Sequence, residues 1–290
     1  MDTKKYEVFA KTVELSSLTA AAQALGLTQS AVSHIIAAIE EELQLTLLKR
    51  SRTGARLTPE GERLLPYIKE LLRQETLLHK AAEGLRGLAA GVVRIGTFTS
   101  VATHWLPGMM KEFQQLHPQV EFRLFNGDYH DVNQWLRQGS VDLAFTTLPM
   151  EHDCECIVLG EDRLMAVLPE GHPLAGQEVC AVADVAAEPF ISLLETSDHD
   201  ARRALDKAGL RPNVKFSTKD DYAILAMVRQ GLGVSIMPEL LLRGQNAVAV
   251  RPLDPPSSRI LALALPAGEC TGPAARRFAE FAVDWVGKNI

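Results

Sequence analysis

The sequence has few features of a secreted or membrane protein. Its four cysteines are scattered over 290 residues, which does not resemble a disulfide framework. The longest segment without Asp, Glu, Lys or Arg, residues 95–110, contains two glycines, a proline and four Ser or Thr residues, so it is not a membrane span. Residues 1–15 mix charged with apolar residues and lack the apolar core of a secretory signal. We therefore expect a cytoplasmic protein, and its length favours more than one domain.

The chain also lacks an excess of positive charge and any recognisable catalytic pattern. The formal net charge is −6, but residues 1–90 contain 12 basic against 11 acidic residues, whereas the remainder contains 18 against 25. P-loop, G-x-S-x-G, H-E-x-x-H and paired-cysteine zinc patterns are absent. The histidines are scattered, and nothing places a nucleophile beside a base. We expect no enzymatic activity and no cofactor.

What the chain does contain is a series of three short helical patterns at its start. Apolar residues at i, i+3, i+4 and i+7 spacing predict a helix around residues 6–13. A second helix is predicted at 18–25, followed by a turn at Gly26 and a helix from Gln29 to about Leu43, with Thr28 as its N-cap. Two helices joined by a glycine turn, the second beginning with short polar side chains, can place that second helix in a DNA major groove. The alternative is a three-helix packing unit with a solvated polar face.

A basic stretch then favours DNA binding over this alternative. Residues 47–57 contain four basic and no acidic residues, with a glycine at the expected hairpin turn. Basic side chains on a wing beside a recognition helix suit phosphate contacts, although the stretch also fits a solvated loop.

The segment SSLTAAAQALGLTQSAVSHIIAAIEEELQLTLLKRS, the basic turn and LTPEG together resemble the winged helix-turn-helix of LysR-type transcriptional regulators. The match covers about sixty residues, and later segments fit the family too. The resemblance implies DNA-binding residues Thr28, Gln29, Ser30, Ser33 and His34 on the recognition helix and Lys49, Arg50 and Arg52 on the wing. Ser30 and His34 depart from the proline and arginine that family members often carry there.

A long helix is predicted after Thr58, with Pro59 at its first position. Apolar residues alternate at spacings of four and three in a heptad seam, with one glutamate among them: Leu64, Ile68, Leu71, Glu75, Leu78, Ala82 and Leu85. The seam predicts a homodimer, the alternative being packing on the chain's own body. Glu75 is costly there unless it is paired. The resemblance also implies dimerisation through this helix, tetramers built from the dimers, and binding to an interrupted inverted repeat.

Residues beyond Gly91 alternate short Val/Ile/Leu-rich strands with helices, the first of these helices running from Ser100 to about Leu116, which predicts a doubly wound α/β architecture. The resemblance implies a multi-domain fold in which an all-α winged helix-turn-helix with a long linker helix precedes a two-lobed α/β effector domain similar to type 2 solute-binding proteins. The expected boundaries are 1–58 for DNA binding, 59–89 for the linker helix and 90–290 for the effector domain. Its first lobe takes about 90–161 and 267–290, and its second lobe 162–266.

Hydroxyl side chains recur where the predicted strands end and helices begin, positions at which α/β sheets bind ligands. Such helix starts favour a small anion, although each hydroxyl could simply cap its helix. The resemblance implies an effector in the cleft between the lobes, with Ser100 as its main contact. The full expected set is Thr99, Ser100, Val101, Asp128, Thr147, Ser197 and Thr218. Asp128 departs from the hydroxyl of relatives that bind acids, which argues against a simple carboxylate.

Three potential soft ligands share one face if residues 152–156 are extended: His152, Cys154 and Cys156. A metal or redox role is one interpretation, and an ordinary strand between the lobes is the other.

The sequence as a whole predicts a LysR-type regulator controlled by a small-molecule effector, with RNA polymerase as a candidate partner. A solute-binding module for transport would require a secretory signal. An α/β enzyme with a DNA-binding head would require a catalytic constellation.

Overall fold

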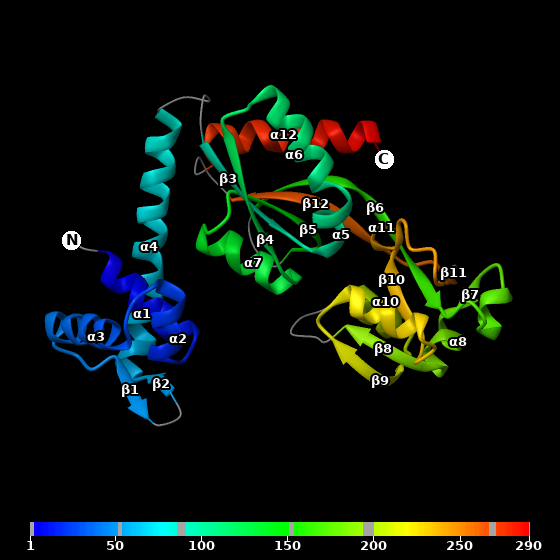
Figure 1. Ribbon diagram of the computed structural model, residues 1–290, viewed down its shortest axis with the longest axis horizontal. Coiled ribbons are helices and arrows are strands. Elements are labelled where there is room, and N and C mark those ends of the chain that lie inside the picture. Colours follow the sequence, from blue (N-terminus) through cyan, green and yellow to red (C-terminus); the bar gives the residue numbers. More distant parts are fainter. Residues whose placement is uncertain are drawn as a thin grey trace. The chain divides into compact units, whose positions relative to one another are not determined.

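The computed structural model describes residues 3–51, 54–85, 91–150, 154–193, 200–266 and 271–289. The chain divides into two compact units, Met1–Ala82 and Glu83–Ile290 (Figure 1). Within the described residues, no helix combines the length and apolar character needed to cross a membrane.

The first unit contains the predicted helices and the hairpin. Its elements are α1 (Lys4–Glu14), α2 (Leu18–Leu25), α3 (Gln29–Leu43), β1 (Leu48–Ser51), β2 (Gly54–Leu57) and α4 (Pro59–Leu85). The Ser17 hydroxyl caps α2 by accepting the Ala20 N–H at 3.3 Å, and the Thr28 hydroxyl caps α3 by accepting the Ala31 N–H at 3.1 Å. Gly26 ends α2 at φ +66°, in the left-handed region that glycine adopts without a Cβ clash. These caps set the start of α3 at the position expected from the sequence.

A single core holds this unit together. Phe9 of α1 and Val32, Ile36 and Ile39 of α3 are completely buried in it. The wing contributes further apolar side chains, and Ile68 of α4 is buried against the same cluster. The helix α3 is therefore held by its inner face, and Gln29, Ser30 and His34 lie exposed at its start.

The two halves of the heptad seam of α4 lie in different environments. Leu64, Ile68 and Leu71 pack against the core of the first unit, as the intrachain alternative predicted. Further along, Leu78 is 69% exposed. The carboxylate of Glu75 accepts a hydrogen bond from the Thr3 hydroxyl, so this charged seam position is paired within the chain.

The wing is anchored at both ends. The Glu40 carboxylate of α3 accepts the backbone N–H groups of Leu47 and Leu48 at 2.7 and 3.0 Å. At the other end, the Ala55 N–H donates to the Ser16 carbonyl at 2.8 Å. A Cβ at Gly54, whose φ is +130°, would lie 2.4 Å from that carbonyl oxygen, so this approach requires glycine. The hairpin consequently keeps a defined position relative to α3.

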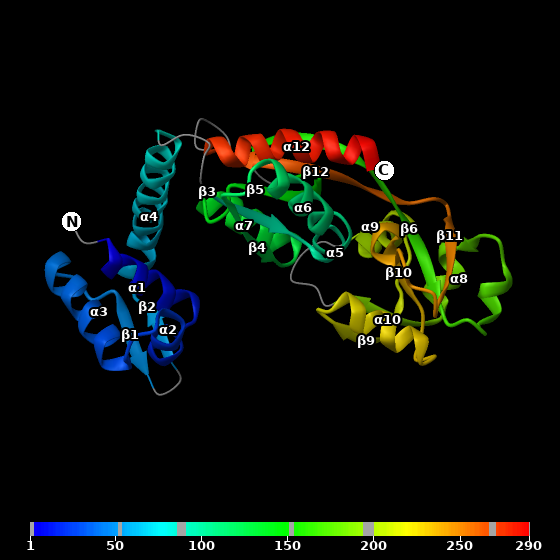
Figure 2. The same cartoon turned by 45° about the horizontal axis from the view of Figure 1, so that its top comes forward.

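The second unit consists of two α/β lobes joined by crossing strands (Figures 1 and 2). The first lobe begins with β3 (Gly91–Thr97), α5 (Thr99–His104), α6 (Leu106–Leu116), β4 (Val120–Asn126), α7 (Tyr129–Gln138) and β5 (Leu143–Leu148). After β6 (Cys154–Leu168), the second lobe comprises the 3₁₀ turn Pro173–Gly176, β7 (Cys180–Ala181), α8 (Val182–Ala187), β8 (Pro189–Leu193), α9 (Asp200–Lys207), β9 (Asn213–Thr218), α10 (Asp221–Arg229), β10 (Ser235–Pro238), α11 (Glu239–Leu242) and β11 (Ala249–Asp254). Finally, β12 (Ser258–Pro266) and α12 (Pro273–Asn289) complete the first lobe.

The long strand β6 connects the lobes. Its first part pairs with β12, and its second part pairs with β10 and β11. The strand order is β4-β3-β5-β12-β6-β11-β7, with β10 also on β6 and β8-β9 forming a separate pair. Because β3 lies parallel to both β4 and β5, with helices in the connections, the doubly wound α/β prediction is confirmed.

Two expectations about this unit were wrong. The sequence placed residues 258–266 in the second lobe, but β12 pairs with β5 and buries Leu261 and Leu263 in the first-lobe core. Its apolar pattern marks a buried strand without indicating which sheet receives it. The helix expected from Ser100 to Leu116 is also broken at Trp105 into α5 and α6. Pro107, which lacks an N–H and restricts the residue before it, explains the break.

We expect Ile36→Ala to destabilise the first unit by about 2–5 kcal/mol, because it removes a fully buried side chain from between α1, α3 and the wing. Urea unfolding of the full chain, followed by helical circular dichroism, measures the loss. Leu45→Ala, at a position 41% exposed, is the control and should change little. Equal losses in the two variants would contradict this account of the core.

Candidate functional site

The first candidate surface lies at the start of α3. The side chains of Gln29, Ser30 and His34 are exposed, and Ser33 is half-buried. Thr28 is exposed as well, and its hydroxyl lies 3.0 Å from that of Ser30 while capping the helix. The residues proposed to read DNA thus share one accessible helix start, where backbone N–H groups also attract phosphate.

The wing adds basic side chains to this unit. Lys49 on β1 pairs in register with Arg56 on β2, and both side chains are exposed. Like charges placed directly opposite each other are unfavourable in isolation, so this pair favours a neighbouring anion. Arg56 belongs to the basic stretch but was not among the expected contacts. Arg50 lies on β1 without a described side chain, and Arg52 lies outside the described residues.

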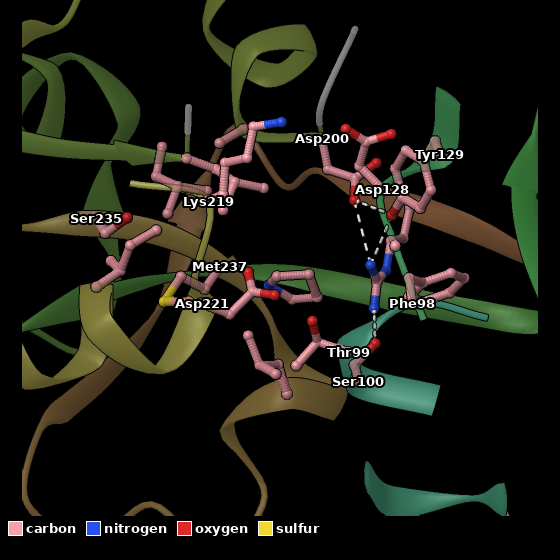
Figure 3. Close-up of a pocket in the computed structure, with 18 of the residues that line it drawn as sticks. Phe98, Thr99, Ser100, Asp128, Tyr129, Asp200, Lys219, Asp221, Ser235 and Met237 are labelled. Carbon is pink, nitrogen blue, oxygen red and sulfur yellow. Dashed lines mark hydrogen bonds and ion pairs between the residues drawn. The ribbon is translucent and has the colours of Figure 1, made fainter. Parts of the chain in front are cut away.

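The second candidate site is a cavity of about 300 Å³ between the lobes of the second unit (Figure 3). The first lobe and the crossing strand β12 supply its more polar side, whereas the second lobe supplies an apolar wall with three charged residues. The residues that line the cavity include Phe98, Thr99, Ser100, Asp128, Tyr129, Asp131, Phe190, Asp200, Lys219, Asp221, Ile224, Ile236, Met237, Leu241 and Arg259.

Arg259, at the start of β12, is the centre of this cavity's polar network although only 5% of it is exposed. Its Nε and Nη2 donate to Asp162 Oδ2 at 2.9 and 2.6 Å, and Nη2 also donates to the Ser100 hydroxyl at 2.7 Å. Its Nη1 donates to the Tyr129 hydroxyl at 2.7 Å and to Asp200 Oδ2 at 3.3 Å. The dashed lines from Ser100, Tyr129 and Asp200 in Figure 3 therefore converge on one guanidinium.

The network joins the two lobes. The Tyr129 hydroxyl of the first lobe donates to Asp200 of the second lobe at 2.7 Å, and Asp200 also pairs with Arg203. The Phe98 ring lies 5.0 Å from the guanidinium carbon of Arg259, within cation–π range. Each buried charge is thus matched by an opposite charge and by hydrogen bonds, which burial requires.

Burial alone would lower the pKa of Arg259, but Tyr129 and the carboxylates of Asp200 and Asp162 raise it above its usual value. Burial also raises the pKa of Tyr129 above its usual range. Arg259 is consequently a permanent cation, and Tyr129 keeps the proton that it donates to Asp200.

The cavity contains three of the expected effector contacts. Thr99, Ser100 and Asp128 line it, and Asp128 also caps α7 by accepting the Asp131 N–H at 2.9 Å. Asp128 therefore both caps α7 and lines the cavity.

Of the other expected contacts, the three that the structure describes do not line the cavity. Val101 is completely buried in the first-lobe core, and Thr147 is buried on β5. The Thr218 hydroxyl accepts the Asp220 N–H at 3.2 Å, but it does not cap α10, whose N-cap is Asp220. Ser197 lies outside the described residues.

Cys154 and Cys156 lie on β6, as the strand interpretation predicted. The Sγ atoms of Cys154 and Cys156 are 3.5 Å apart, and the Met150 Sδ lies 3.4 and 3.5 Å from them. All three side chains pack against the apolar cluster of Val132 and its neighbours. His152 lies outside the described residues, within which no three His, Cys, Asp or Glu side chains are grouped to hold a metal ion.

Comparison with known families accounts for both units. Residues 3–62 match the family described as bacterial regulatory helix-turn-helix protein, lysR family, and residues 86–287 match the LysR substrate binding domain. The chain belongs to the LysR family of transcriptional regulators. Its two-part fold, with a helix-turn-helix followed by a two-lobed α/β effector domain, is that of the family.

Similar LysR-family proteins extend over the whole chain. The uncharacterized HTH-type transcriptional regulator YvbU of Bacillus subtilis is 33% identical over 291 residues, covering 99% of each chain. The probable HTH-type transcriptional regulator LrrA of Synechococcus elongatus is 34% identical over 281 residues, covering 96% of this chain and 95% of that one. The crystal structure of HinK, a LysR family transcriptional regulator from Pseudomonas aeruginosa, covers both chains completely with 30% identity and a TM-score of 0.62.

We expect Arg259→Met to destabilise the effector domain by about 3–5 kcal/mol, because it leaves the buried Asp162 without its cation and removes one of the two cations that pair with Asp200. Urea unfolding monitored by tryptophan fluorescence reports this domain, since all three tryptophans lie in it. The matched control is Arg163→Met, which removes an exposed ion pair with Glu239 and should leave the midpoint nearly unchanged. A small loss from Arg259→Met would contradict the central role of this arginine.

Proposed function

We propose that this LysR-family regulator binds an interrupted inverted repeat near a promoter through the exposed start of α3 and the wing. The observation that carries this assignment is the accessible polar helix start, Thr28 to His34, in the same compact unit as the Lys49–Arg56 pair. A helix of this kind reads base edges, whereas wing cations neutralise phosphates without sequence information.

Within that surface, Gln29 pairs with an adenine edge, and Ser30, Ser33 and His34 contact neighbouring bases or phosphates. Lys49 and Arg56 contact the phosphate backbone, as do Arg50 and Arg52. The exposure of Gln29 and Lys49 supports this division of labour.

The protein acts as a homodimer through the second half of α4, with tetramers built from two dimers. The exposure of Leu78, beyond the part of the seam that packs on the first unit, supports this assignment. A twofold dimer presents two recognition helices, which matches the symmetry of an inverted repeat.

The effector binds in the cavity between the lobes and changes how the dimers are arranged on DNA, and so the access of RNA polymerase to the promoter. The Arg259 network supports such a role because it connects residues of both lobes beside the cavity. A ligand can produce this change only by binding the two arrangements with unequal affinity.

We expect Gln29→Ala to weaken discrimination at one base pair of the operator by about 1–3 kcal/mol, with little effect on random duplex. Lys49→Ala should weaken binding to the operator and to random duplex alike, and it should reduce the slope of log affinity against log salt by about 1. Binding titrations at several salt concentrations distinguish these effects. Lys288→Ala on α12 is the surface-charge control. If Gln29→Ala lowered affinity for all sequences equally, its base-reading role would be disproved.

We expect Leu78→Asp to dissociate the dimer, because a dimer seam would bury the new carboxylate without a partner. Sedimentation velocity measures the change in mass. Leu116→Asp, at another leucine that is 65% exposed, serves as the matched control and should leave the assembly intact. An unchanged mass for Leu78→Asp would exclude this part of α4 from the dimer interface.

A further inference from the structure

The cavity between the lobes is acidic. Four aspartates line it, Asp128, Asp131, Asp200 and Asp221, against two cations, Lys219 and Arg259. An effector must therefore enter a site whose charged side chains are mostly negative. How many of these charges remain available to it depends on their existing partners.

Arg259 has no hydrogen-bond donor left for a ligand. A guanidinium carries five N–H groups, and here Asp162 takes two of them while Ser100, Tyr129 and Asp200 take one each. A carboxylate effector could reach this cation only by displacing a buried acceptor, which would then lose its own partner. Arg259 is thus already neutralised by the protein, which leaves Lys219 as the other cation that lines the cavity.

The four aspartates differ in how many hydrogen-bond partners their carboxylates already have. Asp128 and Asp131 form a reciprocal capping box at the start of α7, and Asp200 accepts from Tyr129, Arg259 and Arg203. Asp221, at the first position of α10, contacts a hydroxyl, that of Thr99. Figure 3 shows its carboxylate directed into the cavity. Asp221 is therefore the cavity anion with the most unused acceptor capacity.

Burial raises the pKa of Asp221, and the Thr99 hydroxyl and the charge of Arg259 oppose this shift only in part. The carboxylate is thus partly desolvated without a bound cation to compensate it. A ligand ammonium group at this position would supply that compensation through charge-assisted hydrogen bonds.

The residues around Asp221 indicate what the rest of the ligand should be like. The second-lobe wall beside it is apolar, with Phe190, Ile224, Ile236, Met237 and Leu241 lining the cavity. An apolar wall with a few placed polar groups is the usual composition of a small-molecule site. The complementary molecule carries one cationic end and one apolar body.

We propose that the effector is a small primary amine with an apolar body, whose ammonium group pairs with Asp221 and whose body lies against the second-lobe wall. This inference rests on the proposed function, in that it assigns a ligand class to the effector cavity. It reverses the charge that the helix starts alone suggested, because the Ser100 hydroxyl already accepts a hydrogen bond from Arg259 and four aspartates line the cavity.

The test is a thermal unfolding screen of the full chain with three amines and acids of matching skeleton. The pairs are phenethylamine with 3-phenylpropionate, hexylamine with heptanoate, and tryptamine with indole-3-propionate. We expect at least one amine to raise the unfolding temperature, with saturation on titration, and its matched acid to leave it unchanged. The inference is overturned if no amine stabilises the protein, or if an acid does so as well as its amine.

Variants then locate the site for the amine that binds. Asp221→Asn keeps the size of the side chain and should raise the dissociation constant about ten- to hundredfold, measured by calorimetry. The control is Asp254→Asn, on β11 of the same lobe and exposed, which should leave the dissociation constant unchanged. Circular dichroism confirms that both variants are folded. Equal affinity of wild type and Asp221→Asn would refute the pairing.

The same protein preparation separates this inference from the proposed function. Selective operator binding without any amine binding would reject the ligand class and retain the DNA-binding assignment. The protein could instead bind an amine but show no preference for any genomic fragment over scrambled duplex. That result would reject the proposed operator recognition and retain the cavity assignment.

Discussion

A buried positive charge organises the effector domain. Arg259 lies where β12 returns from the second lobe to the first, and its guanidinium needs opposite charges and hydrogen-bond acceptors because it is withdrawn from water. Those partners come from separate elements: Asp162 on the crossing strand, Ser100 and Tyr129 in the first lobe, and Asp200 in the second. Since each acceptor must be in place to neutralise the charge, the arginine ties the relative position of the lobes to the shape of the cavity.

The helix-turn-helix could be predicted from sequence almost element by element. Its signals are local: the caps Ser17 and Thr28, the turn at Gly26, and a stripe of apolar residues that repeats with helical spacing. The exposed face of α3 followed from the buried one, because Val32, Ile36 and Ile39 fix which side chains point away.

The cavity could be predicted only in part. Thr99, Ser100 and Asp128 stand at strand ends, a position readable from the strand–helix alternation. Arg259 begins an apolar strand and is far along the chain from Ser100, so no local sequence pattern predicts their contact. Short elements such as β7 and α11 were missed because two to four residues carry no periodicity. The assignment of β12 to a sheet failed for a related reason, since strand pairing is a long-range property.

The two contacts between the lobes beside the cavity differ in how easily a ligand can replace them. The Arg259 network is charged, buried and fully occupied, so exchanging any member leaves an unpaired group behind. The second is the approach of Thr99 of the first lobe to Asp221 of the second, which lies on the cavity wall outside that network. A small molecule that competes for Asp221 can therefore alter the second contact while the first persists. The lobes would then move about a fixed charged centre rather than separate, and the energy available for that movement is the difference between the ligand's affinities for the two arrangements.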